Sequence, residues 1–299
     1  MITNNKEQDQ FIEDYLDGKI PMGLGIGSNE LDHHLRYKQG QFVIVNGLDN
    51  VGKTAWMLWY FLALAVNHGK KFCIYSAENN PSVLVMHLIE MYLTKKITEA
   101  SKENIYAAKA FIYEHFKFID YKGFYKAEEL LDIFKNSGCD AGLIDPYTAL
   151  NREYTHAANY DFLNLTRSFV NKHNFTIYVN THVVSEAARA VHSPNEGGHI
   201  TSQGLVGYQR PPSKSQSEGG QPFANRVDDF ITIHRYIGHS DLKYKTMVYI
   251  RKVKDTHTGG QPTGIDEPVW FDWNYGCGFT CNGVNPINNN DINYNKAPF

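Results

Sequence analysis

The sequence has no apolar run long enough to cross a membrane and no features of a secretory signal. Its longest apolar run, from Ala55 to Val66, is shorter than the roughly 20 residues that a membrane-spanning helix requires. The first ten residues are polar and lack the basic and apolar regions of a signal peptide. We therefore expect a cytoplasmic protein with no membrane partner.

Cysteine is scarce, and the chain has no excess of positive charge. Four cysteines in 299 residues are too few for a disulfide framework, so reduced thiols are expected. The pair Cys277 and Cys281 lacks the second Cys or His pair of a zinc site. A net charge of -3 excludes a globally basic nucleic-acid binder but not a local basic channel. Any contact with nucleic acid must therefore be local.

The sequence does contain enough apolar residues, 42%, for a large core, in segments that alternate between strand and helix patterns. Strands are expected at 41–46, 72–76, 117–120, 141–144, 176–180, 230–234, 247–251 and 269–273. Helices are expected at about 53–67, from Asn80-Pro81 onward, and at 101–115, 126–136 and 161–173. This alternation predicts an α/β fold with a central, mainly parallel sheet flanked by helices.

Three segments lie outside this alternation. Residues 1–20 hold a short amphipathic helix, expected at 7–18, which packs either on its own domain or on a neighbouring subunit. Residues 184–224 are polar and rich in Gly and Pro, which indicates a long functional or mobile loop within a main domain at 21–281. Residues 282–299 are rich in Asn, which predicts a disordered tail.

One motif indicates a specific chemistry. The segment Gly47-Leu-Asp-Asn-Val-Gly-Lys-Thr54 matches the P-loop pattern, follows an apolar strand and begins a helix. Phosphate binding needs this arrangement, because backbone N–H groups and the helix N-terminus hold the anion. We expect Lys53 to reach the terminal phosphates of ATP and the Thr54 hydroxyl to hold Mg²⁺. The residues expected to bind nucleotide here are Gly47, Asn50, Val51, Gly52, Lys53 and Thr54.

Polar residues at the ends of three later strands are candidates for the rest of the site. Asp145 is predicted to hold the metal, since open sheets bind ligands at the carboxyl ends of their strands; capping of a helix is the alternative. Glu78 is a candidate base for the attacking water, or only a favourable charge beside the next helix. His182 is either a sensor of the γ-phosphate or an ordinary satisfied histidine.

A basic segment, Arg251-Lys-Val-Lys254, ends a late strand. It has two interpretations. Either it is a solvated basic patch, or Lys252 and Lys254 reach the nucleotide of a neighbouring subunit, as finger residues do in trans. The residues alone leave both interpretations open.

In this order, the motifs resemble the RecA-fold motor domain of hexameric replicative helicases of the DnaB, Twinkle and phage primase-helicase group. The resemblance covers about residues 18 to 280 and rests on 47–54, Ser76-Ala-Glu78, Leu143-Ile-Asp145, His182, 225–235 and Lys252-Val-Lys254. It implies a RecA-like P-loop NTPase that hydrolyses ATP with Mg²⁺. The roles implied are catalytic glutamate for Glu78, metal ligand for Thr54 and Asp145, γ-phosphate sensor for His182, base-stacking arginine for Arg235, and trans fingers for Lys252 and Lys254.

The function that the resemblance implies is that of a DNA-replication motor. Such a motor is an ATP-dependent helicase or translocase on single-stranded DNA, and it forms a homo-oligomeric ring, expected to be a hexamer, with nucleotide at the subunit interfaces. A separate primase or polymerase is a further candidate partner. The branch resembled makes a bacterial or phage-infected cell the expected setting.

Three departures from the family pattern bear on this interpretation. Lys254 stands where the family usually has an arginine finger, and Lys lacks the forked geometry of Arg, so the alternatives are slower hydrolysis or substitution by Arg251. No primase or loader domain is expected before residue 18. The loop at 184–224 is long and is the expected DNA-contacting segment; its candidate contacts are Arg189, His192, His199, Gln203, Tyr208, Arg210, Lys214 and Ser215, with Glu186, Glu196 and Glu218 nearly balancing its cations.

Two rival functions share the nucleotide site. A recombination ATPase of the RecA or RadA kind has the same fold but forms filaments; His182 and Lys252-Val-Lys254 favour the helicase branch. A non-motor assembly factor, in which ATP only gates a protein interface, stays open because of Lys254 and because no accessory domain is expected. ATPase activity with and without single-stranded DNA separates these functions.

Overall fold

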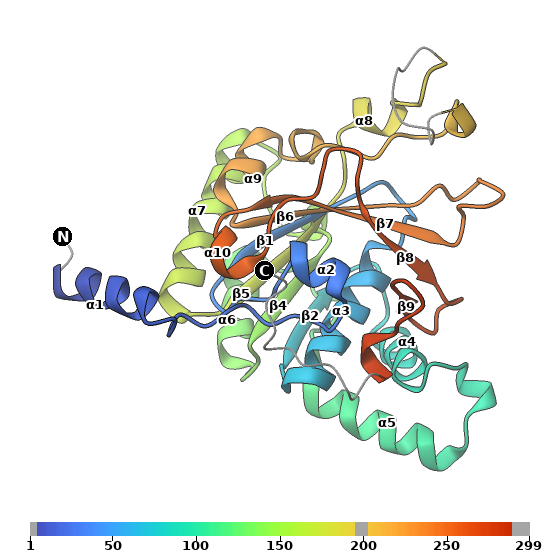
Figure 1. The fold of residues 1–299 in the computed structure, drawn as a ribbon, viewed down its shortest axis with the longest axis horizontal. Coiled ribbons are helices and arrows are strands. Elements are labelled where there is room, and N and C mark those ends of the chain that lie inside the picture. Colours follow the sequence, from blue (N-terminus) through green and yellow to red (C-terminus); the bar gives the residue numbers. More distant parts are fainter. Residues whose placement is uncertain (1–4, 195–202, 289–299) are drawn as a thin grey trace.

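A nine-stranded sheet runs through the described part of the molecule, with helices on both of its faces (Figure 1). The computed structural model describes residues 5–194 and 203–288. The strand order is β3-β2-β4-β5-β1-β6-β7-β8-β9. The strands are β1 (Phe42–Asn46), β2 (Phe72–Ser76), β3 (Phe116–Phe118), β4 (Ala141–Asp145), β5 (Thr176–Thr181), β6 (Asp229–His234), β7 (Lys245–Val253), β8 (Val269–Trp273) and β9 (Phe279–Thr280).

The six strands from β3 to β6 in this order are parallel, and β7, β8 and β9 extend the sheet in antiparallel fashion. The register places the last residue of β1, Asn46, beside Thr181 at the end of β5 and beside Thr232 near the end of β6. Asp145 at the end of β4 likewise faces Ser76 at the end of β2. Five strands therefore end at one edge of the sheet. The predicted mainly parallel α/β sheet is confirmed.

The helices divide between the two faces of the sheet. Residues of α3, α4 and α5 share one core cluster, and residues of α6, α7 and α9 share the other. No helix among the described residues is both long and apolar enough to span a membrane. The helices are α1 (Asn5–Leu16), α2 (Asn29–His34), α3 (Lys53–His68), α4 (Pro81–Leu93), α5 (Lys102–His115), α6 (Ala127–Asn136), α7 (His156–His173), α8 (Ser185–Arg189), α9 (Gln221–Arg226) and α10 (Thr256–Gly259).

The longest apolar run of the sequence lies in α3, which is buried on all sides. Trp56 and Trp59 are fully buried, and the carboxyl-terminal strands β8 and β9 of the same sheet contribute to this burial. The Trp59 ring packs edge-on against Phe271 in β8 and Phe279 in β9, at centroid distances of 5.4 and 5.5 Å. The helix that follows the P-loop is therefore held rigidly, which fixes the position of the loop.

The structure differs from the sequence-based expectations mainly near the chain ends. The amino-terminal helix, α1, spans Asn5–Leu16 where 7–18 was expected, and it buries none of its residues; Tyr15 touches the domain, with its hydroxyl 3.4 Å from His257 Nδ1. The tail predicted from 282 begins too early, since Ile287 is buried and Asn67 in α3 donates to the Pro286 carbonyl at 3.5 Å. Residues 289–299, the rest of that predicted tail, lie outside the described residues.

The segment 184–224 is more ordered than a structureless loop. It contains α8, the 3₁₀ turns 203–205 and 214–216, and the start of α9. The start of the segment is paired with its later part: Val183 forms a bridge with Ser217, and Val184 N donates to the Gln216 carbonyl at 2.9 Å. His199 and Glu196 lie outside the described residues.

Candidate active site

The predicted site residues come together at the carboxyl edge of the parallel strands. The P-loop (47–54) follows β1, Glu78 follows β2, Asp145 ends β4, His182 follows β5 and Arg235 follows β6. Because neighbouring parallel strands end side by side, five segments separated in the sequence meet at one place. The arrangement is that of a nucleotide site, while the role of each residue remains a prediction.

The backbone of the P-loop requires its glycines. Gly52, the residue before α3, has a φ of 90°, in the left-handed region that favours glycine. A Cβ atom on Gly47 would lie 2.4 Å from the Ile233 carbonyl oxygen of β6, so only glycine fits against that strand. The buried Lys53 folds back over the loop, and its Nζ donates to the carbonyls of Gly47 and Leu48 at 2.9 Å each. The lysine is thus held at the centre of the loop.

Asp145 is the buried centre of a hydrogen-bond network. Its Oδ2 accepts from the hydroxyls of Thr54 at 2.8 Å and Ser76 at 3.1 Å, and its Oδ1 accepts from Asn180 Nδ2 at 2.7 Å. The residue is 2% exposed. Ser76 and Asn180 were not among the predicted site residues, although both are polar residues in otherwise apolar strands, which is a usable signal.

The residues around Asp145 suit a magnesium ion. A carboxylate and a hydroxyl oxygen lie within hydrogen-bond distance of each other, and Mg²⁺ prefers oxygen ligands, completed by phosphate oxygens and water. Asn180 Oδ1 beside them is buried and has no hydrogen-bond partner in the described structure. No cluster of three or more His, Cys, Asp or Glu residues in the described chain offers an alternative metal site. Thr54 and Asp145 would therefore hold the ion together with the nucleotide.

His182 and Glu78 lie beside Asp49 of the P-loop. His182 Nδ1 lies 2.9 Å from Asp49 Oδ1, and its Nε2 lies 3.7 Å from Glu78 Oε1. The side chains of Glu78 and Asp49 are largely exposed, which leaves both open to solvent water. Burial lowers the pKa of Lys53, whereas the charges of Asp145, Asp49 and Glu78 raise it. Three carboxylates therefore lie near one ammonium group.

Arg235 contacts both the P-loop and β8, which lies two strands beyond β6 in the sheet. Its Nη2 donates to the Asn50 carbonyl at 3.0 Å, and its guanidinium lies 5.1 Å from the centroid of the Trp273 ring. Burial lowers the pKa of Arg235. Trp273, at the end of β8, stacks with Tyr244 at 6.2 Å. The sequence did not indicate Trp273, because the pairing of β8 with β7 is what brings this aromatic group to the site.

Lys252 and Lys254 lie at the opposite edge of the sheet from the P-loop of their own chain. Strand β7 runs antiparallel to β6, and its end, Val253, pairs with Asp229 at the start of β6. Lys252 donates to three carbonyls at the end of α9, those of Ala224, Asn225 and Val227, at 2.7–3.1 Å. Lys254 lies 3.1 Å from Asp228 Oδ1 and is 66% exposed. Neither lysine can serve its own P-loop from there.

Arg251, considered as a substitute finger, is held inside its own chain. Its Nη1 donates to the Ile265 carbonyl at 2.9 Å and its Nη2 to the Pro212 carbonyl at 3.3 Å. The guanidinium also lies 4.1 Å from the centroid of the Tyr249 ring, and burial lowers its pKa. This geometry gives the substitution by Arg251 no support.

The loop at 184–224 is attached to the nucleotide edge at two places. Glu218 N donates to the His182 carbonyl at 2.8 Å, directly behind the predicted sensor. His192 Nε2 lies 2.9 Å from the Tyr236 hydroxyl, next to Arg235. The cationic and hydroxyl candidates that stay exposed in the described part of the loop are Arg189, Arg210, Lys214 and Ser215. A change at the nucleotide edge can therefore reach the loop through two short connections.

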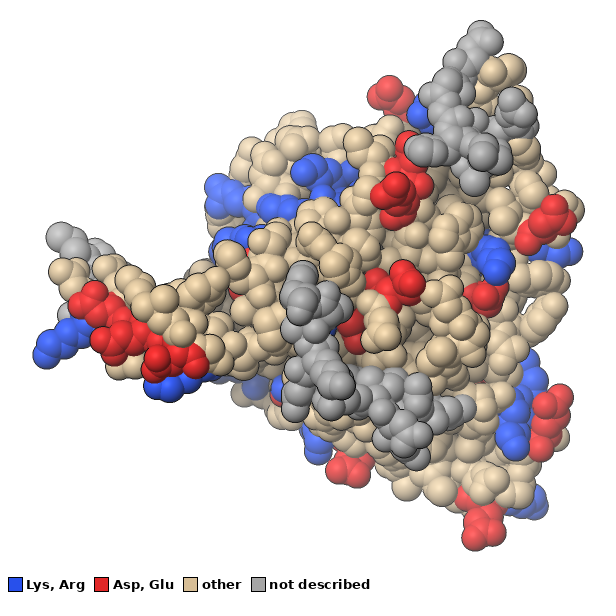
Figure 2. All heavy atoms as spheres, in the orientation of Figure 1, with Lys and Arg blue, Asp and Glu red and all other residues tan. Residues whose placement is uncertain are grey.

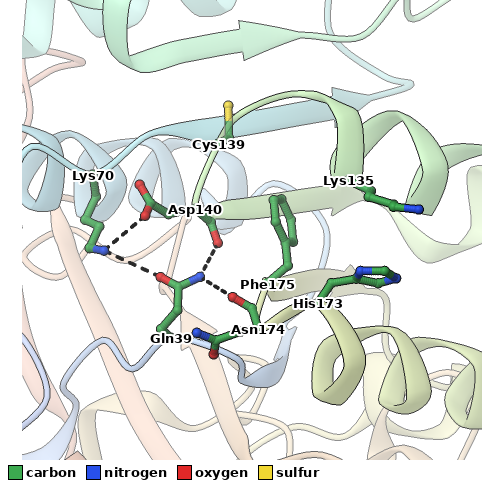
Figure 3. A pocket seen from close by; sticks show the side chains of 8 residues that line it. All are labelled: Gln39, Lys70, Lys135, Cys139, Asp140, His173, Asn174 and Phe175. Carbon is green, nitrogen blue, oxygen red and sulfur yellow. Dashed lines mark hydrogen bonds and ion pairs between the residues drawn. The ribbon is translucent and has the colours of Figure 1, made fainter.

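A cavity of about 430 Å³ opens at the other edge of the sheet (Figure 3). Its polar groups largely satisfy one another: Lys70 Nζ lies 3.1 Å from Asp140 Oδ1, and Gln39 Nε2 donates to the carbonyls of Asp140 and Asn174. In Figure 3 the Cys139 thiol points away from this group. The cavity lies before β1, β4 and β5 begin, far from the P-loop, and is not part of the nucleotide site.

No family model matches this chain, and no curated protein sequence matches it. Solved structures do. The ATPase domain of G40P superposes with a TM-score of 0.74 at 14% identity, covering 94% of this chain and 99% of that one. A DnaB-like replicative helicase, described with its interactions with primase, gives a TM-score of 0.70 at 15% identity, covering 93% and 67%. The RadB recombinase gives 0.52 at 18%, covering 86% and 98%.

These likenesses establish the fold. The two helicase structures superpose better than the recombinase, over nearly the whole of this chain. The resemblance inferred from the motifs is thus confirmed at the level of architecture. The chain has the RecA-like α/β fold that these helicase ATPase domains and this recombinase share.

Proposed function

We propose that this protein is an ATPase that couples hydrolysis to movement along single-stranded DNA, as a homo-oligomeric ring of the replicative-helicase type. The observation that carries the proposal is the division of the charged groups between two edges of one sheet. The phosphate loop and its three carboxylates lie at the carboxyl edge, and exposed Lys254 lies at the other. A neighbour in a head-to-tail assembly would bring the two edges together.

The residues at the carboxyl edge suit the parts of phosphoryl transfer. Lys53 would bind the terminal phosphates, and Thr54 and Asp145 would hold Mg²⁺, which neutralises charge on the phosphate oxygens. Glu78 would orient the attacking water and take its proton as the water oxygen bonds to the γ-phosphorus and the bond to the bridging oxygen breaks. His182, between Glu78 and Asp49, would sense the γ-phosphate and pass its loss to the loop at Glu218.

The amino-terminal helix supports a head-to-tail assembly. Phe11, Ile12, Tyr15 and Leu16 in α1 are 49–77% exposed, an apolar face that the described residues leave largely uncovered. Figure 1 shows α1 projecting from one end of the molecule and α5 lying at the other. A groove of about 440 Å³, lined by residues of α4, α5 and β3 that include Val85 and Phe116, offers an apolar seat for the helix of a second copy.

Removing residues 1–20, or replacing Leu16 by Asp, is expected to leave a folded monomer that no longer assembles. The reason is that the apolar face of α1 has few partners within its own chain beyond the 3.4 Å contact of Tyr15 with His257. Light scattering with ATP and single-stranded DNA measures the assembly, and Asp9→Asn on the same helix is the control. Assembly of the truncated chain at wild-type concentration contradicts this role of α1.

The proposed activity is tested by the ATPase rate with and without single-stranded DNA, followed by strand displacement on a forked duplex. We expect DNA to stimulate hydrolysis, because the loop 184–224 is attached to the nucleotide edge at His182 and Tyr236. Stimulated ATP hydrolysis without strand displacement would indicate a translocase that does not unwind the duplex. An ATPase indifferent to DNA supports the nucleotide-gated assembly factor, and helical filaments in electron micrographs support the recombination ATPase.

The proposed setting follows from the same function. A ring motor on single-stranded DNA would work in the cytoplasm of a bacterial or phage-infected cell beside a separate primase or polymerase. One structural neighbour is a replicative helicase described with its interactions with primase, which supports such a partner.

A further inference from the structure

A group of cationic side chains surrounds the start of β6, at the edge of the sheet opposite the P-loop. The carboxylate of Asp228 pairs with Arg167 at 2.5 Å and with Lys254 at 3.1 Å. Lys252 and Arg226 lie beside this pair, since Lys252 donates to the Val227 carbonyl and Arg167 to the Arg226 carbonyl. Asp228 therefore pairs with two cations, and two more lie close by. Figure 2 shows Lys and Arg side chains gathered over α7 and α9.

Two of these four cations have structural partners that hold them in place. The Lys252 ammonium is surrounded by three carbonyls at the end of α9, and burial followed by the charge of Lys214 lowers its pKa. The Arg167 guanidinium is divided between the nearly buried Asp228 carboxylate and the Arg226 carbonyl. Removing either group would disturb the end of α9. Both are therefore poorly placed to reach a ligand outside the chain.

Arg226 differs from them in its exposure and in its partners. It is the last residue of α9 and is exposed. Its Nη1 donates to the neutral side-chain oxygen of Asn164 at 2.6 Å, and its guanidinium lies 5.9 Å from the centroid of the Tyr160 ring. Within the described residues no carboxylate pairs with it. Because its side-chain partner is a neutral amide, the positive charge of this guanidinium is available to an anion.

We propose that Arg226 is a catalytic residue that acts in trans, with its guanidinium on the γ-phosphate of the nucleotide held by a neighbouring subunit and Lys254 beside it. This inference rests on the proposed ring ATPase. It names the guanidinium that a neighbouring subunit would contribute to each nucleotide site. Arg226 precedes β6 and the P-loop follows the parallel strand β1, so a strand length of about 16 Å separates Arg226 from its own P-loop. The geometry points to a nucleotide on another subunit.

The chemistry explains why a guanidinium is needed in addition to Lys254. An ammonium group acts as a point charge, whereas a guanidinium donates two parallel hydrogen bonds to two phosphate oxygens. Arg251 is held by its own chain, so it does not supply this fork. Arg226 supplies the forked donor on the same face that presents Lys254.

Single variants provide the first part of the test. Arg226→Gln is expected to lower the DNA-stimulated ATPase rate by about tenfold to a hundredfold, the value of hydrogen bonds to a charged group. Arg226→Lys should lie between it and the wild type, because it retains the charge and loses the fork. ATP binding and light scattering should not change. Lys172→Ala, which removes an exposed cation from the last turn of α7, is the control.

Mixed assemblies distinguish action in trans from action within one chain. Arg226→Gln subunits retain the P-loop, and Lys53→Ala subunits retain Arg226, so an equal mixture should recover roughly a quarter of the wild-type rate from the interfaces that combine both intact halves. No recovery, or an Arg226→Gln protein with the wild-type rate, overturns the inference while the wild-type ATPase stands. A wild-type protein that neither assembles nor hydrolyses ATP overturns the proposed function itself.

Discussion

Lys53→Ala lowers ATP hydrolysis by about a thousandfold, to the background rate, because it removes the cation that lies at the centre of the phosphate loop. Lys53 is buried, is held by two loop carbonyls and faces the charges of Asp145, Asp49 and Glu78. Without its ammonium group these carboxylates would repel the triphosphate. Release of inorganic phosphate at saturating ATP measures the fall, and binding of a fluorescent ATP analogue should weaken with it.

The control for this variant is Lys109→Ala in α5, which removes a lysine that lies over the Tyr113 ring, away from the site. Both proteins should melt within a few degrees of the wild-type temperature, since the P-loop is positioned by the packing of α3 and not by the lysine ammonium group. A Lys53→Ala protein that hydrolyses ATP at the wild-type rate would place the nucleotide site elsewhere, and with it the ring proposal would fail.

Glu78→Gln is expected to lower kcat by about 10² to 10⁴ while leaving the affinity for ATP unchanged. The amide retains the size of the carboxyl group but cannot accept a proton from water. In the structure the carboxylate is largely exposed and 3.7 Å from His182, so it is open to the water that it would activate. The two variants thus separate binding from chemistry: Lys53→Ala weakens both, and Glu78→Gln weakens only the second.

The matched control is Glu114→Gln, another exposed glutamate, which lies in α5 near Lys71. Single-turnover hydrolysis after loading with ATP gives the chemical step directly. An unchanged kcat in Glu78→Gln would leave the alternative that Glu78 only favours the start of α4. Retained assembly in this variant would show that ATP binding, and not its hydrolysis, builds the ring.

Much of the fold could be predicted from the sequence because its signals are local. Asn80 and Pro81 begin α4 as expected, and Gly69 ends α3 with a φ of 65°. The parallel order of the strands follows from their alternation with helices. The short strand β9 and the helix α2 gave no local pattern strong enough to find, since each is stabilised by contacts with distant segments: Phe279 of β9 packs on Trp59, and His34 of α2 hydrogen-bonds to the Gln261 carbonyl.

The site was predictable to the extent that each residue stands at the end of a recognisable strand. Asp145, Glu78 and His182 could be found in this way. Ser76, Asn180 and Trp273 were missed. Polar residues near the ends of apolar strands were a signal for the first two, but the contacts with Asp145 and Arg235 depend on which strands become neighbours.

The sequence by itself determined that a phosphate loop exists and which strand ends surround it, because the P-loop conformation depends on a few adjacent residues. Only the tertiary structure decided which cationic side chains can contact a ligand outside their own chain. Lys252, Arg251 and Arg167 are held by carbonyls or a buried carboxylate; Lys254 shares that carboxylate but is 66% exposed, and Arg226 is exposed with a neutral amide as its side-chain partner. The sequence shows which residues are charged. Which of these charges find a partner in the folded chain depends on long-range packing, which local sequence patterns do not reveal.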